Sequence, residues 1–307
     1  MKSIAAALVS LCLVLVVTLT KSLEPPMWHM INCNTTSQGD CHLLEDNSIY
    51  TMIDAGQLQI ARLELLPYLS ERNIKKIDHF FISHPHTDHY GGLELIAEAG
   101  IKVKNIYHSA LPADVSDFNY EPIKFQALLL KYESLGTTVH NINAGFSLEL
   151  PTSKIYVLEA KKTRQNEVND YSIIMSWDAG GYRTLFTGDL SRNLGAALAK
   201  FDQYKADILK VPHHGVSGIA PTEFFDNVGP NLLMLPAHQE LWYNARSSQI
   251  RDWASKNWSI KRTHVCSNGF NGDVRISFHQ THLGLDPQFP NTTCPKKDWY
   301  IEPKPRT

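Results

Sequence analysis

The chain has few cysteines, almost no excess charge and no internal repeats, and each of these absences excludes a class of protein. Its 307 residues include 5 cysteines, none of them spaced as Cys-x-x-Cys, which argues against a zinc ribbon. Lys and Arg number 29 against 31 for Asp and Glu, which argues against a broad basic surface for wrapping nucleic acid but leaves a local basic cleft open. With 43% hydrophobic residues and no low-complexity segment, the composition excludes a disordered, collagen-like or coiled-coil chain. The apolar content is enough for one large core or at most two smaller ones.

The longest apolar run lies at the N-terminus. Lys2 precedes the apolar run 4–19, and Thr20, Lys21 and Ser22 follow it, as is typical of a secretory signal peptide. No Ala-x-Ala cleavage site is present, so cleavage near Ser22 is an expectation. The alternative is an uncleaved signal anchor, because the run reaches the lower length limit of a membrane span. We expect a secreted or periplasmic protein. Cleavage would remove the positive charges of Lys2 and Lys21 and change the formal net charge from −2 to −4.

The remaining cysteines agree with export. Cys33, Cys41, Cys266 and Cys294 suit one or two disulfides in an oxidising compartment. The sequence does not choose between the alternative pairings.

Short β-type runs alternate with helical runs along the rest of the chain. Strands are predicted over 48–53, 77–83, 154–158, 172–177, 183–187 and 207–211, and helices over 60–71, 93–99, 125–135, 193–200 and 248–256. Meandering strands mix with strand–helix units, so the fold class is α/β or α+β rather than all-β. We expect a signal peptide at 1–22, one domain at 23–285 and a C-terminal tail at 286–307.

The densest cluster of residues suited to chemistry lies in SHPHTDHYGG, residues 83–92, directly after an apolar strand. Three imidazoles and a carboxylate, from His84, His86, Asp88 and His89, can converge at the end of that strand. These ligand types hold Zn²⁺ or Mn²⁺ in proteins. The Gly91–Gly92 pair would let the backbone bend tightly beneath them. We interpret the segment as a metal site rather than as a His-rich polar turn.

Two further segments repeat this arrangement. One apolar strand ends in Gly188-Asp189, and another ends in His213-His214-Gly215. Either signal alone is weak, because Gly-Asp is an ordinary turn and a His pair after a strand is often at the surface. Three strands that deliver His and Asp to the same kind of edge predict one rigid site.

Together these motifs resemble the metallo-β-lactamase-fold hydrolases. Four finer segments, 38–40, 53–56, 169–172 and 210–215, are similar to the metallo-hydrolase domain of competence DNA-internalisation proteins and to secreted phosphorylcholine esterases. The resemblance covers about residues 38–272. It implies a four-layer αββα sandwich with a two-metal site along one edge of the sheets.

The resemblance also implies the ligands of two divalent ions, Zn²⁺ or Mn²⁺. His84 and His86 would bind the first metal, Asp88 and His89 the second, Asp189 would bridge both, and His213 or His214 would complete the second site. Two such cations lower the pKa of a bridging water and hold a phosphoryl oxygen. The catalytic candidates are Asp88, His213 and His214.

The chain departs from the family pattern in two places. Many relatives supply another His before the Gly-Asp strand, where this chain has Asn169 and Asp170. The competence-type domains also lack that His. An oxygen ligand there favours a harder ion, so Mn²⁺ competes with Zn²⁺. A Gly-His-Pro motif near the end is also missing, and His238 or Arg246 is the candidate to contact metal or phosphate in its place.

The sequence therefore predicts an exported binuclear metal-dependent hydrolase, most simply a phosphodiesterase acting on DNA or a small phosphodiester. One signal-sized segment cannot form a DNA pore, so we do not expect a membrane channel, and no stable protein partner is implied. The first alternative is a lactonase or β-lactamase-type hydrolase, which needs an apolar acyl pocket. The second is a non-catalytic binding protein that kept the fold.

Overall fold

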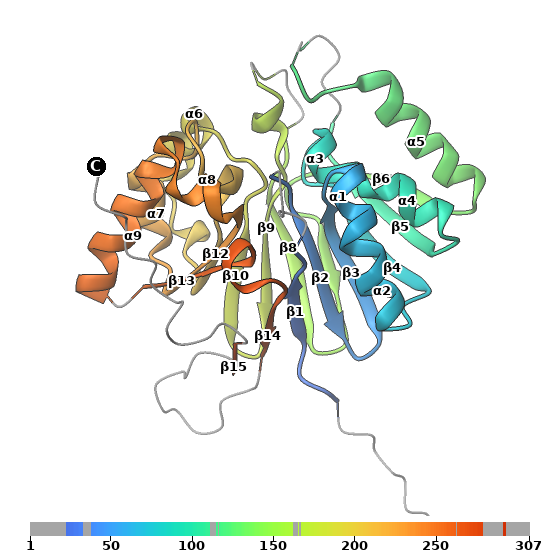
Figure 1. The fold of residues 1–307 in the computed structure, drawn as a ribbon, viewed down its shortest axis with the longest axis horizontal. Helices are drawn as coiled ribbons and strands as arrows, with labels where there is room; N and C mark the ends of the chain where they lie inside the picture. Colours follow the sequence, from blue (N-terminus) through green and yellow to red (C-terminus); the bar gives the residue numbers. More distant parts are fainter. Residues whose placement is uncertain are drawn as a thin grey trace, which may run out of the picture.

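The computed structural model describes residues 23–32, 38–110, 115, 117–161, 165, 167–261, 263–278 and 291–292. In this part the chain forms two β-sheets packed face to face, with helices on both outer sides (Figure 1). The mixed α/β class predicted from the sequence is confirmed. The predicted signal peptide, Cys33 and Cys294 lie outside the described residues.

The first sheet joins strands from both ends of the chain. Its spatial order is β15-β14-β1-β2-β3-β4-β5-β6. The strands are β1 (Met27–Met30), β2 (Cys41–Asp46), β3 (Ile49–Ala55), β4 (Lys76–Phe81), β5 (Lys102–His108), β6 (Thr138–Asn141), β14 (Val274–Ser277) and β15 (Asn291–Thr292). Strands β3 to β6 are parallel, and the others pair antiparallel. β15 falls in the segment predicted as a tail, so that segment returns at least once to the sheet.

The second sheet has the spatial order β13-β12-β11-β10-β9-β8-β7. Its strands are β7 (Ser147–Glu149), β8 (Ser153–Glu159), β9 (Ile174–Ala179), β10 (Tyr182–Phe186), β11 (Ile208–Lys210), β12 (Leu232–His238) and β13 (His264–Ser267). β10 to β13 are parallel, whereas β7 to β10 form an antiparallel meander. Each sheet thus has a parallel half, and parallel strands end at a common edge.

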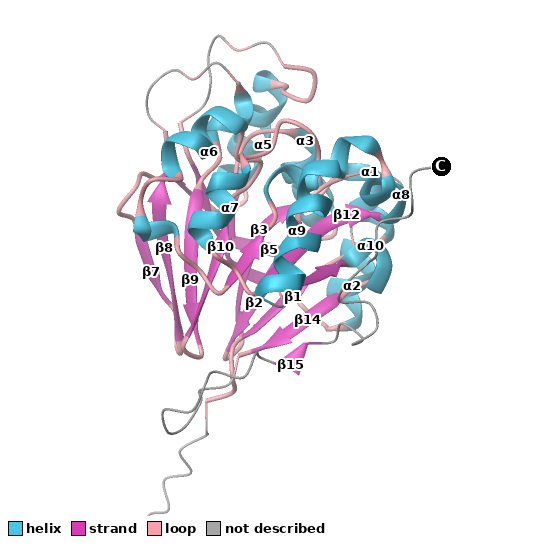
Figure 2. Cartoon of the chain, turned by 90° about the vertical axis from the view of Figure 1, so that its left-hand side faces the viewer, coloured by secondary structure: helices cyan, strands magenta, loops and turns pink. Residues whose placement is uncertain are grey.

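Helices cover the outer face of each sheet (Figures 1 and 2). On the side of the first sheet are α1 (Leu58–Leu63), α2 (Leu65–Glu71), α3 (Thr87–Tyr90), α4 (Gly92–Glu98) and α5 (Pro122–Ser134). On the side of the second are α6 (Arg192–Leu198), α7 (Thr222–Val228), α8 (Gln239–Tyr243), α9 (Ser248–Lys261) and α10 (Asn268–Asn271). Four short 3₁₀ turns in the described part are η1 (Val168–Tyr171), η2 (Asp202–Tyr204), η3 (Pro212–Gly215) and η4 (Ala245–Ser247).

Three apolar clusters hold these layers together. One, which includes Leu65 and Phe80, lies between the first sheet and its helices. The second, which includes Trp28 and Trp177, fills the space between the sheets. The third, which includes Phe224, lies between the second sheet and its helices. Because each interface buries its own apolar side chains, the order of layers is αββα.

The helix predicted over 60–71 is in fact two helices, α1 and α2, which meet at Glu64. Pro67 explains the break. Proline has no backbone N–H, and its ring clashes with the carbonyl four residues earlier, here that of Leu63.

The described cysteines and helices test part of what the sequence predicts about disulfides and membrane spans. Cys41 in β2 is a buried thiol rather than half of a disulfide. A disulfide that involves Cys266 of β13 remains a prediction, because its candidate partners lie outside the described residues. In the portion of the chain described above, no helix has the length and apolarity needed to cross a bilayer.

Candidate metal centre

The parallel strands of both sheets end at the upper edge of the sandwich in Figure 1 and deliver the site residues there. His84 and His86 follow β4 in the first sheet, and Asp88 and His89 lie in α3 directly after them. All four side chains are buried. His84 Nε2 lies 3.0 Å from His86 Nδ1, so these two rings present nitrogen atoms to the same point.

Gly91 and Gly92 are required here for close packing rather than for a special bend. Gly91 has an ordinary helical conformation (φ −55°, ψ −38°). A Cβ on Gly92 would lie 2.2 Å from the carbonyl oxygen of Ala55 at the end of β3. The glycines therefore let the start of α4 rest on β3, which corrects the reason inferred from the sequence.

Asp189 lies at the centre of the site. It follows β10 after Gly188, whose φ of 49° is left-handed. Its Oδ2 is 3.3 Å from His89 Nε2, 3.4 Å from His214 Nε2 and 3.9 Å from His84 Nε2. One carboxylate oxygen is thus shared by histidines from both sheets.

The His213–His214 pair has a strained backbone. Both residues have left-handed φ values, 47° and 52°, in the turn η3 after β11. Left-handed backbone in a residue other than glycine costs about 1–3 kcal/mol and persists where the surroundings impose it. The turn buries His214, whose Nε2 lies 3.5 Å from Asp88 Oδ2, and leaves the side chain of His213 19% exposed. His213 Nε2 is 3.9 Å from Asp189 Oδ2, at the margin of the cluster.

The donor atoms form two groups that share Asp189. Asp88, His89, Asp189 and His214 make one group, and His84, His86 and Asp189 make the other. In each group the donor atoms lie within 4.8 Å of one another. Within the described part of the chain, five of these residues have a buried nitrogen or oxygen that forms no hydrogen bond: His86 Nε2, Asp88 Oδ1, His89 Nε2, Asp189 Oδ1 and His214 Nε2. Buried polar atoms are normally satisfied, so this donor set fits divalent cations.

A carboxylate stands behind three of the histidines. His89 Nδ1 is 2.8 Å from Asp54 Oδ2, and His214 Nδ1 is 3.3 Å from Asp40 Oδ1. His86 Nε2 is 3.3 Å from the carboxylate of Asp117. Such outer partners fix the tautomer and orientation of a metal-binding imidazole. In each pair the opposite ring nitrogen is the one that faces the donor groups.

The charged groups of the cluster shift one another's pKa values. Burial disfavours the charged form of His89, but Asp189 and Asp54 outweigh it and raise the pKa of His89 well above its usual value. His214 behaves alike: burial opposes its protonation, but Asp189 and Asp40 raise its pKa. Burial would raise the pKa of Asp189, but His89 and His214 lower it well below its usual range. A metal ion at this site therefore competes with protons held by the histidines.

The four remaining candidates are placed less centrally. Asn169 Oδ1 is buried, with no hydrogen-bond partner among the described residues. Asp170 instead accepts a hydrogen bond from the Ser191 hydroxyl. His238 Nδ1 accepts a hydrogen bond from the backbone N–H of Leu241 at the start of α8. Arg246 is exposed.

Sequence reasoning assigned no role to several residues that support the ligands. Asp40, Asp54 and Lys210 lie in segments that carried the family resemblance, but nothing in their spacing showed what they contact. Asp117, in the segment before α5, had no sequence signal at all. Their roles depend on contacts between distant parts of the chain.

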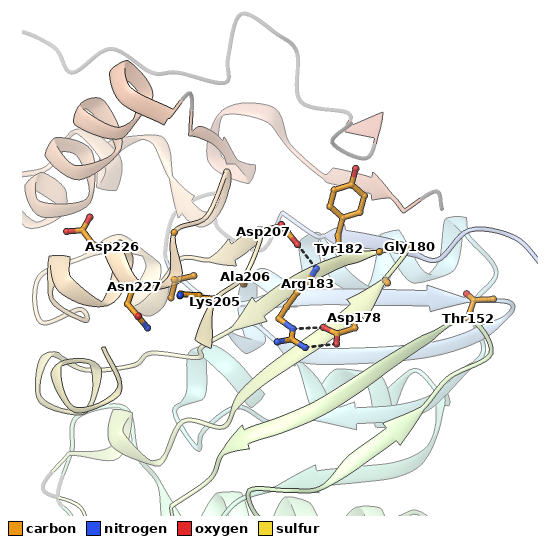
Figure 3. A pocket seen from close by; sticks show the side chains of 14 residues that line it. Thr152, Asp178, Gly180, Tyr182, Arg183, Lys205, Ala206, Asp207, Asp226 and Asn227 are labelled. Carbon is orange, nitrogen blue, oxygen red and sulfur yellow. Dashed lines mark hydrogen bonds and ion pairs between the residues drawn. The ribbon is translucent and has the colours of Figure 1, made fainter. Parts of the chain in front are cut away.

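A broad hollow of about 790 Å³ lies at the opposite end of β9 and β10, around the Gly180–Gly181 turn (Figure 3). Arg183 of its lining is held by two neighbouring carboxylates. Arg183 Nε and Nη2 donate to the two oxygens of Asp178 at 2.8 and 2.9 Å, and the Arg183 backbone N–H donates to Asp207. β10 leads from this turn to Asp189, so the hollow lies a full strand away from the metal centre.

Comparisons with known proteins agree with this fold. Residues 34–133 match the model of the Metallo-beta-lactamase superfamily. ComE operon protein 3 of Bacillus subtilis is 26% identical over 206 residues, which is 67% of this chain but only 25% of that protein. Among solved structures, a variant of the CmlA beta-hydroxylase superposes with a TM-score of 0.53 at 11% identity, over 82% of this chain and 54% of its own. The last likeness concerns the fold alone.

Proposed function

We propose that this chain, whose residues 34–133 match the model of the Metallo-beta-lactamase superfamily, is an exported, binuclear metal-dependent phosphodiesterase. The observation that carries the proposal is the pair of donor groups joined at Asp189 Oδ2. His84 and His86 would hold one cation, and Asp88, His89 and His214 the other. When bound, two divalent cations acidify water and stabilise the negative charge that develops on a phosphoryl oxygen.

The protein's own groups would orient the substrate and the attacking water. Asp88 has one buried oxygen without a hydrogen bond, which can accept a proton from water held between the donor groups. His213 is the partly exposed histidine at the margin and would contact a phosphate oxygen or the leaving group. Burial lowers the pKa of His213, so its imidazole is neutral near pH 7.

The substrate would be DNA or a small phosphodiester. The resemblance to the competence-type domain favours nucleic acid. The expected negative net charge of the exported chain favours a smaller substrate, because a face that binds DNA normally displaces counterions with clustered Lys and Arg. Zn²⁺ and Mn²⁺ both suit the donors, since imidazoles favour the first and carboxylate or amide oxygens the second.

The test is metal analysis of the purified protein, coupled to hydrolysis of bis-p-nitrophenyl phosphate with Zn²⁺ or Mn²⁺ added. We expect about two metals per chain together with turnover of the diester. Hydrolysis of a short oligonucleotide in the same buffer then separates DNA from small substrates. Two bound metals without turnover of any phosphodiester would overturn the proposed activity and favour a binding protein.

A further inference from the structure

Lys210 is a buried lysine at the base of the metal centre. It ends β11, three residues before His213, and only 1% of the residue is exposed. A buried ammonium is costly unless hydrogen bonds and opposite charges compensate it. Its partners therefore indicate what it does.

The ammonium faces three groups: Asp189 itself, the residue before it, and Asp40, which lies behind His214. It forms an ion pair with Asp40 Oδ2 and donates a hydrogen bond to the Gly188 carbonyl at 2.9 Å. Asp189 Oδ1 lies 3.8 Å away. Lys210 thus faces one oxygen of Asp189, while the other, Oδ2, faces the histidines.

Asp40 extends this arrangement to the first sheet. Its Oδ1 is 3.3 Å from His214 Nδ1, and its backbone N–H donates to the carbonyl of Asp88 at 3.3 Å. Its own carbonyl accepts a hydrogen bond from Gly56 at 2.7 Å. Through Asp40 and Gly188, one side chain of the second sheet contacts all three ligand-bearing segments, directly or through a single residue.

We propose that Lys210 is a positioning residue of the metal centre. Its ammonium holds Asp189 so that Oδ2 alone is presented to both donor groups, and it holds Asp40 behind His214. The inference rests on the metal-binding part of the proposed function and not on the identity of the substrate.

Two effects of losing this charge have opposite signs, which makes the proposal testable. By charge alone, removing a cation beside a divalent site should strengthen metal binding. If Lys210 positions the ligands, its removal weakens metal binding, as loss of outer partners does by about 10- to 100-fold. Freed from Lys210, Asp189 can also offer both oxygens to one cation and so change its coordination.

The experiment titrates Co²⁺ into the metal-free protein, follows the visible absorption, and measures thermal unfolding of the same metal-free samples. The variants are Lys210→Met, Asp40→Asn and the double variant, with Lys205→Met as a control on an exposed lysine. Asparagine at position 40 keeps an oxygen that can accept from His214. The double variant removes both charges of the buried pair, which is far less destabilising than removing one.

We expect Lys210→Met to weaken Co²⁺ binding by about 10- to 100-fold and to alter the absorption spectrum. Binding should stay equally weak in the double variant even where its unfolding temperature recovers. Unchanged or tighter Co²⁺ binding in Lys210→Met would overturn the proposal, as would recovery of affinity together with stability in the double variant. If Lys210→Met alone does not fold, comparison of the double variant with Asp40→Asn decides. No readout needs turnover, so failure here is distinct from failure of the proposed phosphodiesterase.

Discussion

At the scale of single residues, Asp189 carries more of the site than any other side chain. Its Oδ2 lies within 3.9 Å of nitrogens from four histidines. We expect Asp189→Ala to lose most bound metal and activity while the protein stays folded, because the change leaves the three apolar clusters intact. Metal content by mass spectrometry and far-ultraviolet circular dichroism measure the two effects.

The matched control is Asp178→Ala. Asp178 is a half-exposed carboxylate in the same sheet that pairs with Arg183, at the far end of β9. This variant should keep its metal. If Asp189→Ala retains two metals per chain, the assignment of a shared carboxylate is wrong.

The protonation of the ligands predicts an unusual pH dependence for the metal-free protein. His89 and His214 have raised pKa values when folded, so their stabilising contribution is fully present below the unfolded value of 6.5. It is lost as pH rises through the folded values. The pKa values of His84 and His42 are lowered, so these two groups change the stability of the protein only below about pH 6.5. Stability of the metal-free protein should therefore fall as the pH rises above about 6.5.

Urea unfolding of chelator-treated protein at several pH values above about 6.5 checks that slope. Metal affinity should change in the opposite direction, because protons compete with the cation for His89 and His214. A metal-free protein that gains stability as the pH rises above about 6.5 would contradict the assigned protonation.

At the scale of elements, the strands that deliver ligands could be predicted from the sequence. The runs at 77–83, 183–187 and 207–211 are apolar and are followed within three residues by members of the donor groups, so composition and order sufficed. β12 was not predicted, and it contains Pro236, a residue type that is disfavoured inside a sheet. In the structure the ladders of β12 end at Met234 and Leu235, so the proline lies beyond the pairing and costs no sheet hydrogen bond.

The support of the ligands could not be predicted in this way. Asp54 and His89 are separated by 35 residues, and their contact depends on the parallel pairing of β3 with β4. Asp40 and His214 come from different sheets, so their contact depends on how the two sheets pack. The hydrophobic periodicity of a sequence indicates which side of a helix or strand is buried. It does not indicate which residue of another layer packs against that side.

The connection from β10 to α6 allows a test of local geometry. Gly188 has a left-handed φ, and a Cβ there would lie 2.7 Å from Ser172 Oγ and 3.1 Å from Ser83 Cβ. Gly100 also has a left-handed φ, 70°, but faces open space. Gly100→Ala should cost about 1–2 kcal/mol, and Gly188→Ala roughly 1–3 kcal/mol more because of the overlap. Chemical denaturation measures both, and equal costs would show that the crowding is relieved without strain.

At the scale of the whole molecule, the metal centre lies between two halves that each have their own helices and outer core. His84, His86, Asp88 and His89 belong to the first half, and Asp189 and His214 to the second. Cations bound here would connect the two sheets at one edge, whereas the apolar cluster between the sheets connects them along their length. Metal binding should therefore stabilise the sandwich as a unit.

Mass action sets the size of that effect. Free metal at about 100 times its dissociation constant stabilises a folded protein by about 2.7 kcal/mol, which for a chain of this size is a rise in Tm of roughly 4 °C. We expect Zn²⁺ or Mn²⁺ to raise the Tm of chelator-treated protein by this amount, and Asp189→Ala to abolish most of the rise. Calorimetry at fixed pH measures it.

The hydrogen exchange of β4 and β10 should slow together when metal binds, because each strand leads into one side of the centre. If metal slows exchange in β4 alone, the cations are held by one sheet and the shared role of Asp189 fails.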